Sequence, residues 1–306
     1  DLVHYFPGHM VKGIRDLQRR LKDVDCIIEV HDARIPISGR NTDFKETVLL
    51  RPHVVALNKS DLADTSQKDA VFSKFQEDGV KKVVYTTCTG NGSRSLRKEF
   101  LAQVLDIIKS SPRFHRTHVD DFNLLIIGIP NVGKSSLINA LRRDHTRKGG
   151  KPTAVGGVAG ITKSVLEKIK ISSTPRVYMY DSPGILPPDI IDLETGLKLA
   201  VCATLKDHLV GEDIIVDYLL YQLNRLGYFY YVQYFGLKEP TDNVLELLLV
   251  VASRNNLVEK RKNVTTGQLE MKPNFKRAAQ LVLKAFRDGH LGKVNFDKEL
   301  ILNNEM

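Results

Sequence analysis

Residues 128–135 read GIPNVGKS and have the spacing G-x-x-x-x-G-K-[ST], which is typical of a loop that binds the phosphates of a nucleotide. The glycines allow backbone N–H groups to surround the phosphates, and the start of the following helix adds a dipole that favours anions. Lys134 would reach the β- and γ-phosphates as a catalytic cation, and the Ser135 hydroxyl would bind Mg²⁺. The alternative is a chance match, which arises in roughly one chain in a hundred. The motif therefore predicts a nucleotide site that contains Asn131, Val132, Gly133, Lys134, Ser135 and Ser136.

A second motif, Asn58-Lys59-Ser60-Asp61, has chemistry that suits guanine. The Asp61 carboxylate would accept hydrogen bonds from guanine N1–H and the exocyclic amine, whereas adenine has an acceptor at N1 and no amine beside it. The unmet hydrogen bonds would cost about 1.5–3 kcal/mol, enough to reject ATP about tenfold or more. Asn58 would bridge the base and the phosphate loop, and the Lys59 stem would lie along the base. A polar turn with a helix cap at Asp61 is the commoner explanation of such a tetrapeptide alone, but the phosphate loop favours a guanine site here.

Two further segments have residues that would contact Mg²⁺ and the γ-phosphate. Asp181, in the sequence DSPG at 181–184, would hold Mg²⁺ through water, and the Gly184 N–H would contact the γ-phosphate. Thr162 ends a glycine-rich stretch and would complete the Mg²⁺ shell while it responds to the γ-phosphate. The alternatives are an ordinary turn at 181–184 and a loop threonine that caps the next strand. Ser135, Thr162 and Asp181 are thus the predicted Mg²⁺ residues.

The motifs follow stretches that are predicted to be β-strands. Short runs of β-branched residues alternate with longer stretches of helical periodicity, which predicts an α/β domain with a mostly parallel sheet. We expect strands at 24–31, 53–57, 82–86, 122–127, 164–171 and 176–180, and helices at 65–78, 93–110 and 134–143. Doubly wound sheets bind ligands at the carboxyl ends of their strands. The motifs are therefore expected at that edge of the sheet.

The pattern changes after Pro187-Pro188, where the remaining periodicity is helical. We expect helices at 194–205, 213–225, 243–253 and 275–288. The sequence therefore predicts a nucleotide-binding domain with an N-terminal extension over 1–188, and a smaller all-α domain over 189–306.

The charge balance favours a polyanionic partner. The 306-residue chain has 45 Lys and Arg against 36 Asp and Glu, which gives a formal net charge of +9. Basic residues cluster at 113–118, 142–151, 260–262 and 276–277. Charge runs are usually solvated faces, but several on one basic chain favour contact with RNA phosphates. The longest apolar run, 247–252, is far shorter than the ~20 residues of a membrane span, and three scattered cysteines favour a reducing compartment.

The order of the motifs is informative. The motif at 58–61 precedes the phosphate loop, which reverses the order in Ras-like GTPases, and the chain therefore resembles the circularly permuted GTPases. The segments FPGHM at 6–10, DARIP at 32–36 and GRN at 39–41 resemble the ribosome biogenesis GTPase A family. VHDARIPISGRN at 30–41 and ETGLKLAVCATLKDHLVGE at 194–212 resemble its mitochondrial branch. The likeness covers nearly the whole chain and weakens after about Leu257.

The resemblance implies a P-loop GTPase domain in permuted order that hydrolyses GTP to GDP during maturation of the large ribosomal subunit. It also implies that the helical tail contacts rRNA and ribosomal proteins, and that the protein is mitochondrial, with a bacterial-type cytoplasm as the second choice. We expect a monomer that binds no DNA. Because the segment after Gly184 leads into the tail, the nucleotide state is expected to control rRNA contact.

One catalytic feature of Ras-like enzymes is missing. Their water-orienting Gln follows the D-x-x-G turn, where this chain has Ile185, so intrinsic hydrolysis should be slow without the ribosome. His9 is the candidate to orient water, a role that the family resemblance supports, and a structural or solvated histidine is the alternative. Asn131 suggests a bound K⁺ ion, as in cation-dependent GTPases, and a plain loop asparagine is the alternative.

Three classes of function remain open at this stage. The first is a slow GTPase that acts in ribosome assembly, and it is the one we favour. The second is a GTP-dependent binding module with negligible hydrolysis, because Ile185 cannot orient water. The third is a GTPase that associates peripherally with a membrane through its basic segments, which lack a lipidation motif.

Overall fold

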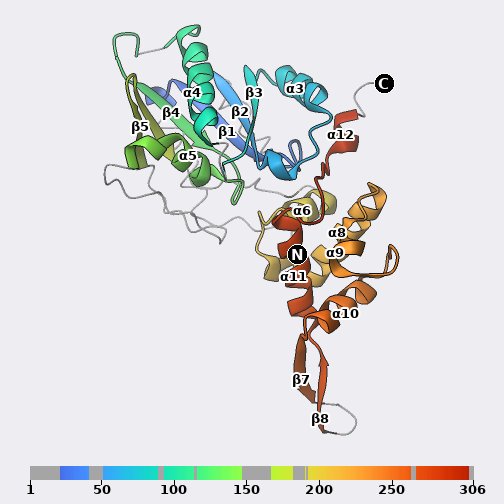
Figure 1. Ribbon diagram of the computed structural model, residues 1–306. Coiled ribbons are helices and arrows are strands. Elements are labelled where there is room, and N and C mark those ends of the chain that lie inside the picture. The colour runs from blue at the N-terminus through green and yellow to red at the C-terminus, as the bar shows by residue number, and fades with distance from the viewer. Residues whose placement is uncertain are drawn as a thin grey trace. The chain divides into compact units, whose positions relative to one another are not determined.

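The chain divides into two units, which Figure 1 shows as ribbons. The computed structural model describes residues 21–40, 51–88, 93–113, 116–146, 167–181, 190, 192–262 and 267–302. The first unit comprises residues 1–195 and 295–306, and the second comprises residues 196–294.

The first unit contains a six-stranded sheet in the order β3-β2-β1-β4-β6-β5. The strands are β1 (Cys26–Asp32), β2 (His53–Asn58), β3 (Lys82–Thr86), β4 (Phe122–Ile127), β5 (Glu167–Ser173) and β6 (Arg176–Asp181). All neighbouring pairs are parallel except β5 and β6, which are antiparallel. Every residue of β1 and β2 is buried, because both faces of a central parallel sheet are covered. The predicted mostly parallel α/β fold is confirmed, with strand ends shifted by up to three residues.

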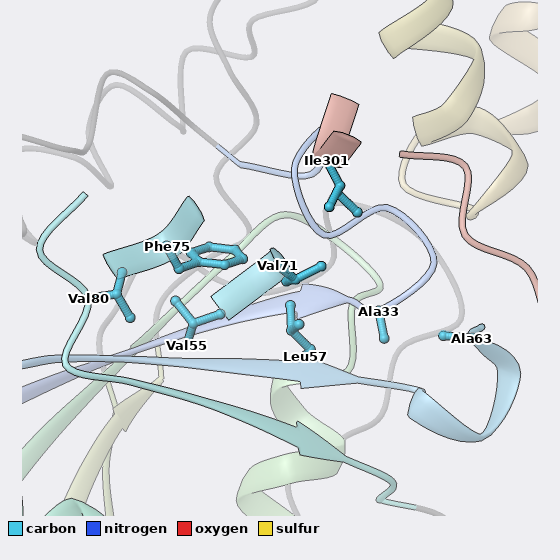
Figure 2. Close-up of a cluster of buried hydrophobic side chains, with 8 residues drawn as sticks. All are labelled: Ala33, Val55, Leu57, Ala63, Val71, Phe75, Val80 and Ile301. Atoms are coloured by element: carbon cyan, nitrogen blue, oxygen red, sulfur yellow. The ribbon is translucent and has the colours of Figure 1, made fainter. Parts of the chain in front are cut away.

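The helices of this unit also follow the predicted periodicity. Among the described residues that precede β5, they are α3 (Lys68–Glu77), α4 (Ser93–Lys109) and α5 (Lys134–Thr146), with short 3₁₀ helices η2 (Leu21–Asp23) and η4 (Ser60–Leu62). Figure 2 shows Val71 and Phe75 of α3 packed over Val55 and Leu57 of β2. This apolar layer fixes β2, whose last residue is Asn58.

Residues 295–306 belong to the first unit. The prediction placed them in the second domain, at 189–306, and the structure differs from it here. Ile301 of α12 (Lys298–Leu302) joins the cluster in Figure 2. Asp297 is fully buried and accepts hydrogen bonds from the backbone N–H groups of Ile37 and Ser38, both at 2.8 Å. Periodicity along the chain could not predict this return, because it depends on contacts some 260 residues apart.

The second unit is mainly helical, as predicted. Its helices are α6 (Leu193–Val201), which begins in the first unit, α7 (Asp207–Val210), α8 (Glu212–Arg225), α9 (Tyr230–Phe235), α10 (Val244–Arg254) and α11 (Phe275–Arg287). Arg287 joins α11 to the start of the unit, since its guanidinium donates to the Asp207 carboxylate at 2.7 Å and to the Ala200 carbonyl at 2.8 Å. No helix of the described residues is long and apolar enough to cross a membrane.

This unit is not all-α, because an antiparallel hairpin separates α10 from α11. Its strands are β7 (Val258–Lys262) and β8 (Leu269–Pro273). The basic run at 260–262 therefore lies on a strand. In β8, Leu269 and Met271 alternate with Glu270 and Lys272, a period of two that is typical of a strand and that the surrounding helical periodicity obscured.

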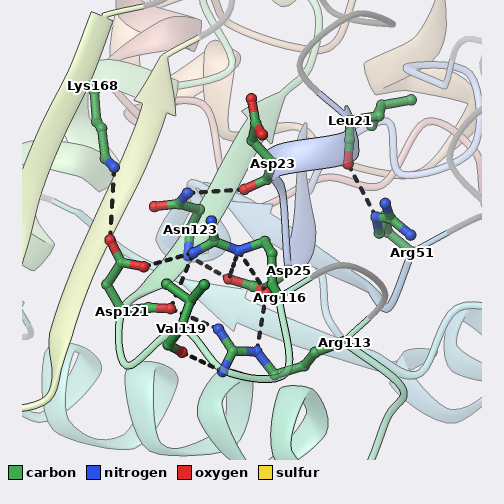
Figure 3. A network of polar contacts seen from close by, with 10 residues as sticks. All are labelled: Leu21, Asp23, Asp25, Arg51, Arg113, Arg116, Val119, Asp121, Asn123 and Lys168. Carbon is green, nitrogen blue, oxygen red and sulfur yellow. Dashed lines mark hydrogen bonds and ion pairs between the residues drawn. The ribbon is translucent and has the colours of Figure 1, made fainter.

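The basic cluster at 113–118 is largely part of the fold of the first unit, which corrects its interpretation as an RNA surface. Figure 3 shows Arg113 and Arg116 converging on Asp25, with Nε–Oδ1 distances of 3.1 and 3.2 Å. The Asp25 side chain is 1% exposed, and its other oxygen accepts the Asn123 N–H at 2.7 Å. Arg116 also pairs with Asp121 at 2.7 Å. These arginines hold the starts of β1 and β4 together.

Candidate functional site

The sheet order brings the two main motifs together. Strand β1 lies between β2 and β4, with Asp32 beside Asn58 in one pair and Glu29 beside Ile127 in the other. All three strands are parallel, so the loops after β2 and β4 leave the same edge of the sheet. The motif at 58–61 and the phosphate loop are thus neighbours, although some 70 residues separate them along the chain.

Asn58 connects these two loops directly. Its Nδ2 donates to the Val132 carbonyl at 2.8 Å, and its Oδ1 accepts from the Thr86 hydroxyl at 3.2 Å. The side chain is 3% exposed. Because both ends of the amide are used in a buried setting, Asn58 fixes the phosphate loop relative to the end of β2.

The glycines of the phosphate loop are required by close contacts. A Cβ at Gly133, where φ is +101°, would lie 2.1 Å from Asn58 Nδ2. One at Gly128, where φ is +144°, would lie 2.3 Å from the Val30 carbonyl oxygen. Asn131 also has a positive φ, at 60°. Positive φ values of this kind are typical of a loop whose backbone N–H groups surround an anion.

Lys134 supplies a buried cation at the start of α5. Its Nζ donates to the carbonyls of Gly128 at 2.9 Å and Ile129 at 3.0 Å, and the residue is 8% exposed. Burial lowers the pKa of Lys134 to about 8, although the Asp181 carboxylate acts in the opposite direction. An ammonium held in this way is poised for an anion with several oxygens, such as a phosphate chain.

Lys59 is positioned by a carboxylate that the sequence analysis did not select. Its φ is 58°, and its Nζ lies 2.9 Å from Asp32 Oδ2. Asp32 also accepts from Arg34 Nε at 2.9 Å and Nη2 at 2.8 Å. Burial disfavours its charge, but Arg34 and Lys59 together hold the pKa of Asp32 well below its usual range. The DARIP segment at 32–36 was the available signal, because an Asp at a strand end with a nearby Arg indicates a positioning pair.

The other two residues of the motif contact Thr87, which directly follows β3. Ser60 Oγ lies 2.9 Å from Thr87 Oγ1, and Thr87 donates to Asp61 Oδ1 at 3.3 Å. Asp61 is exposed, so its carboxylate remains accessible to a ligand. Thr86 and Thr87 were missed because hydroxyl residues at a strand end resemble any turn.

The structure describes two of the three predicted Mg²⁺ residues, Ser135 and Asp181. Ser135 lies in the first turn of α5 and is half-buried, while Asp181 ends β6 and pairs in the sheet with Ile126 of β4. A hydroxyl and a carboxylate are the hard oxygen donors that Mg²⁺ prefers, and phosphate oxygens usually supply further ligands. Thr162, Gly184, Ile185 and His9 lie outside the described residues. Ser136 follows Ser135 in α5 and is also half-buried.

Known proteins match both the sequence and the fold. A protein of Ictalurus punctatus named mitochondrial ribosome-associated GTPase 1 is 47% identical over 97% of this chain and 93% of its own length. A protein of Aedes aegypti named mitochondrial GTPase 1 is 48% identical over 98% of this chain and 95% of its own length. The chain belongs to the mitochondrial ribosome-associated GTPase 1 family. It is therefore a GTPase, and the predicted mitochondrial location is confirmed.

Two further comparisons concern part of the sequence and the fold. The family profile described as 50S ribosome-binding GTPase matches residues 123–224. The crystal structure of GNP-bound YlqF from T. maritima has a TM-score of 0.58 and 22% identity, and the match covers 93% of this chain and 97% of that one. The permuted P-loop GTPase fold predicted for this family member is thus confirmed.

Proposed function

We propose that this mitochondrial GTPase is an assembly factor for the large ribosomal subunit, and that its GTP state controls its contact with rRNA and ribosomal proteins. The observation that carries the nucleotide part is the Asn58–Val132 hydrogen bond at 2.8 Å, because it joins the base-reading and phosphate-binding loops. The names of the relatives and of the 50S ribosome-binding family support the ribosomal part.

The described residues have separable roles in this proposal. Asp61 would accept from the guanine N1–H and amine, and the Lys59 stem, held by Asp32, would lie along the base. Backbone N–H groups of Asn131, Val132 and Gly133 would surround the phosphates. On binding, Lys134 would exchange its two carbonyl partners for β- and γ-phosphate oxygens. Ser60, in the motif at 58–61, and Ser136, directly after the phosphate loop, would line the nucleotide site as well.

Mg²⁺ fits the oxygens of Ser135 and Asp181, with Thr162 as the third predicted residue. When bound, Mg²⁺ supplies positive charge beside the β- and γ-phosphates. In the reaction, the oxygen of a water molecule bonds to the γ-phosphorus and the bond to the bridging oxygen breaks, which releases GDP and phosphate. Lys134 stabilises the charge that develops on these oxygens, while Gly184 would contact the γ-phosphate.

Two further roles in hydrolysis remain, orienting the attacking water and adding positive charge beside the phosphates. His9 would orient the water, because a neutral imidazole nitrogen accepts a hydrogen bond. A K⁺ ion near Asn131 would add charge where other GTPases place an arginine finger. Equal rates of GTP hydrolysis in K⁺ and Na⁺ buffers would refute the K⁺ role and leave the other assignments unchanged.

Base selection is tested by calorimetry with GTP, ATP and XTP. The wild-type protein should prefer GTP to ATP by about tenfold or more. Asp61→Asn should weaken GTP and strengthen XTP, since an amide can donate to the xanthine oxygen that replaces the guanine amine. Equal affinities of the wild type for GTP and ATP would refute the nucleotide assignment.

Hydrolysis is tested by single-turnover measurements with and without mitochondrial large ribosomal subunits. We expect slow intrinsic turnover and stimulation by the subunits. Gly133→Ala should abolish both, because its Cβ would overlap Asn58 Nδ2. Gly227→Ala is the matched control, since φ is +74° there and no atom lies within 4 Å of the added Cβ. GTP-dependent subunit binding without stimulated turnover would favour the binding-module alternative instead.

A further inference from the structure

The β7–β8 hairpin of the second unit has two chemically different faces. In its register, Glu259 pairs with Lys272, Lys260 with Met271 and Lys262 with Leu269. Because side chains alternate along a strand, Lys260, Lys262, Leu269 and Met271 lie on one face, together with Val258. Arg261, Glu259, Glu270 and Lys272 lie on the other. We call these the lysine face and the mixed face.

The mixed face neutralises itself. Arg261 forms an ion pair with Glu259, and Lys272 Nζ lies 3.4 Å from Glu270 Oε2. Two positive and two negative side chains thus occupy this face, and each cation has a carboxylate neighbour. This face therefore offers little net charge to a partner.

The lysine face is cationic and apolar. Among the residues that the structure describes, no carboxylate pairs with Lys260 or Lys262, and both are exposed. Leu269, Met271 and Val258 are 70%, 59% and 53% exposed. Exposed apolar side chains gathered on one face, next to unneutralised charge, are typical of an interaction surface.

The hairpin is firmly attached at its base. The Asn274 N–H donates to the Leu257 carbonyl at 2.9 Å, and the Asn274 side chain caps α11 by accepting from the Arg277 N–H at 2.9 Å. In Figure 1 the two strands extend away from α10 and α11. The lysine face is thus presented on an arm whose root is fixed to two helices of its unit.

We propose that the lysine face binds the backbone and shallow groove of an RNA duplex. The inference rests on the proposed function, and it assigns the RNA contact to one surface. Lys260 and Lys262 are two residues apart on a strand, about 7 Å, and can pair with neighbouring phosphates. The wide, shallow minor groove of A-form RNA can accommodate Leu269 and Met271. Charge complementarity favours RNA over an acidic protein, because phosphates offer a continuous row of anions.

The test is fluorescence anisotropy with the full chain and a labelled RNA duplex of about 16 base pairs, the length that a duplex-binding domain covers. Lys260→Gln/Lys262→Gln removes two charges from the lysine face. We expect binding about tenfold weaker, and a slope of log K against log salt reduced by about two, one for each phosphate contact. Leu269→Ser should weaken binding without a change in slope.

Arg261→Gln/Lys272→Gln is the matched control, because it removes two charges from the mixed face of the same hairpin. It should retain the wild-type salt slope. An equal loss of duplex affinity in the two double variants would overturn the inference, since the total charge of the hairpin and not its lysine face would then determine binding. Duplex binding that neither variant changes would overturn it too.

A membrane or protein partner would give other results. Lysine-dependent flotation with phosphatidylserine vesicles, combined with unchanged duplex binding, would assign the face to lipid and overturn the RNA inference. Large-subunit binding that the lysine variant retains in full would also overturn it. In that case stimulated GTP hydrolysis would still support the proposed function. Failure of the lysine-face inference is thus distinguishable from failure of the proposed function.

Discussion

Two basic clusters of the sequence, at 113–118 and 260–262, have different surroundings in this protein. Arg113 and Arg116 converge on the buried carboxylate of Asp25 and hold the first unit together. Lys260 and Lys262 are exposed on the lysine face of the hairpin. Positive charge in a sequence therefore does not by itself indicate a nucleic-acid surface: what decides is whether the fold places a carboxylate beside it.

The largest expected effect is on the buried cluster. Asp25→Ala would leave two part-buried guanidinium groups without their shared carboxylate, and should lower the free energy of unfolding by about 3–5 kcal/mol. Urea denaturation measures this as a lower midpoint. Asp120→Ala is the control, because the Asp120 side chain is 90% exposed and lies 3.8 Å from Arg176, and it should change stability by less than about 0.5 kcal/mol. Similar midpoints for both variants would contradict the structural role.

Removal of one arginine should have a smaller effect of the same kind. Arg116→Gln loses the charged hydrogen bonds to Asp25 and Asp121, which should cost about 2 kcal/mol of stability. Its salt slope for duplex RNA should equal that of the wild type under conditions where the protein is folded. A reduced salt slope in this variant would contradict the contrast between structural arginines and RNA-binding lysines, because Arg116 would then also contact phosphate.

Lys134 is a third kind of cation: it is buried, and its Nζ donates to two backbone carbonyls rather than to a carboxylate. Its pKa of about 8 lies below the reference value of 10.5, so between these values the unfolded chain holds the proton and stability rises with pH. Phosphates would favour the charged form. Nucleotide binding at pH 8 should therefore take up about half a proton, and affinity should fall at higher pH. Calorimetry in buffers of different ionisation enthalpy measures the uptake, and proton release would contradict the assignment.

The smallest expected effect on stability is in the hairpin. Lys260→Gln/Lys262→Gln should change the free energy of unfolding by less than about 0.5 kcal/mol, since both side chains are exposed and lack carboxylate partners among the described residues. The same urea titration measures it. A loss of 2 kcal/mol or more would show that these lysines are structural, and would remove the contrast with Arg113 and Arg116.

The sequence by itself determined the phosphate loop, the motif at 58–61 and most strands of the sheet. The motifs and the strand and helix periods are patterns among residues close in the chain, such as Gly133 with Lys134, and the sequence alone therefore predicts them. The order of the two motifs along the sequence indicated the permutation, and the sheet order accommodates it.

Only the tertiary structure decided which long-range pairs form. It joined Asn58 to Val132 and Asp32 to Lys59, brought Arg113 and Arg116 to the buried Asp25, and returned Asp297 to Ile37. A charge or amide has many candidate partners along a chain, and its role depends on which one shares its buried surroundings. That choice is made when the strands assemble, because only then is water removed and an unpaired polar group becomes costly.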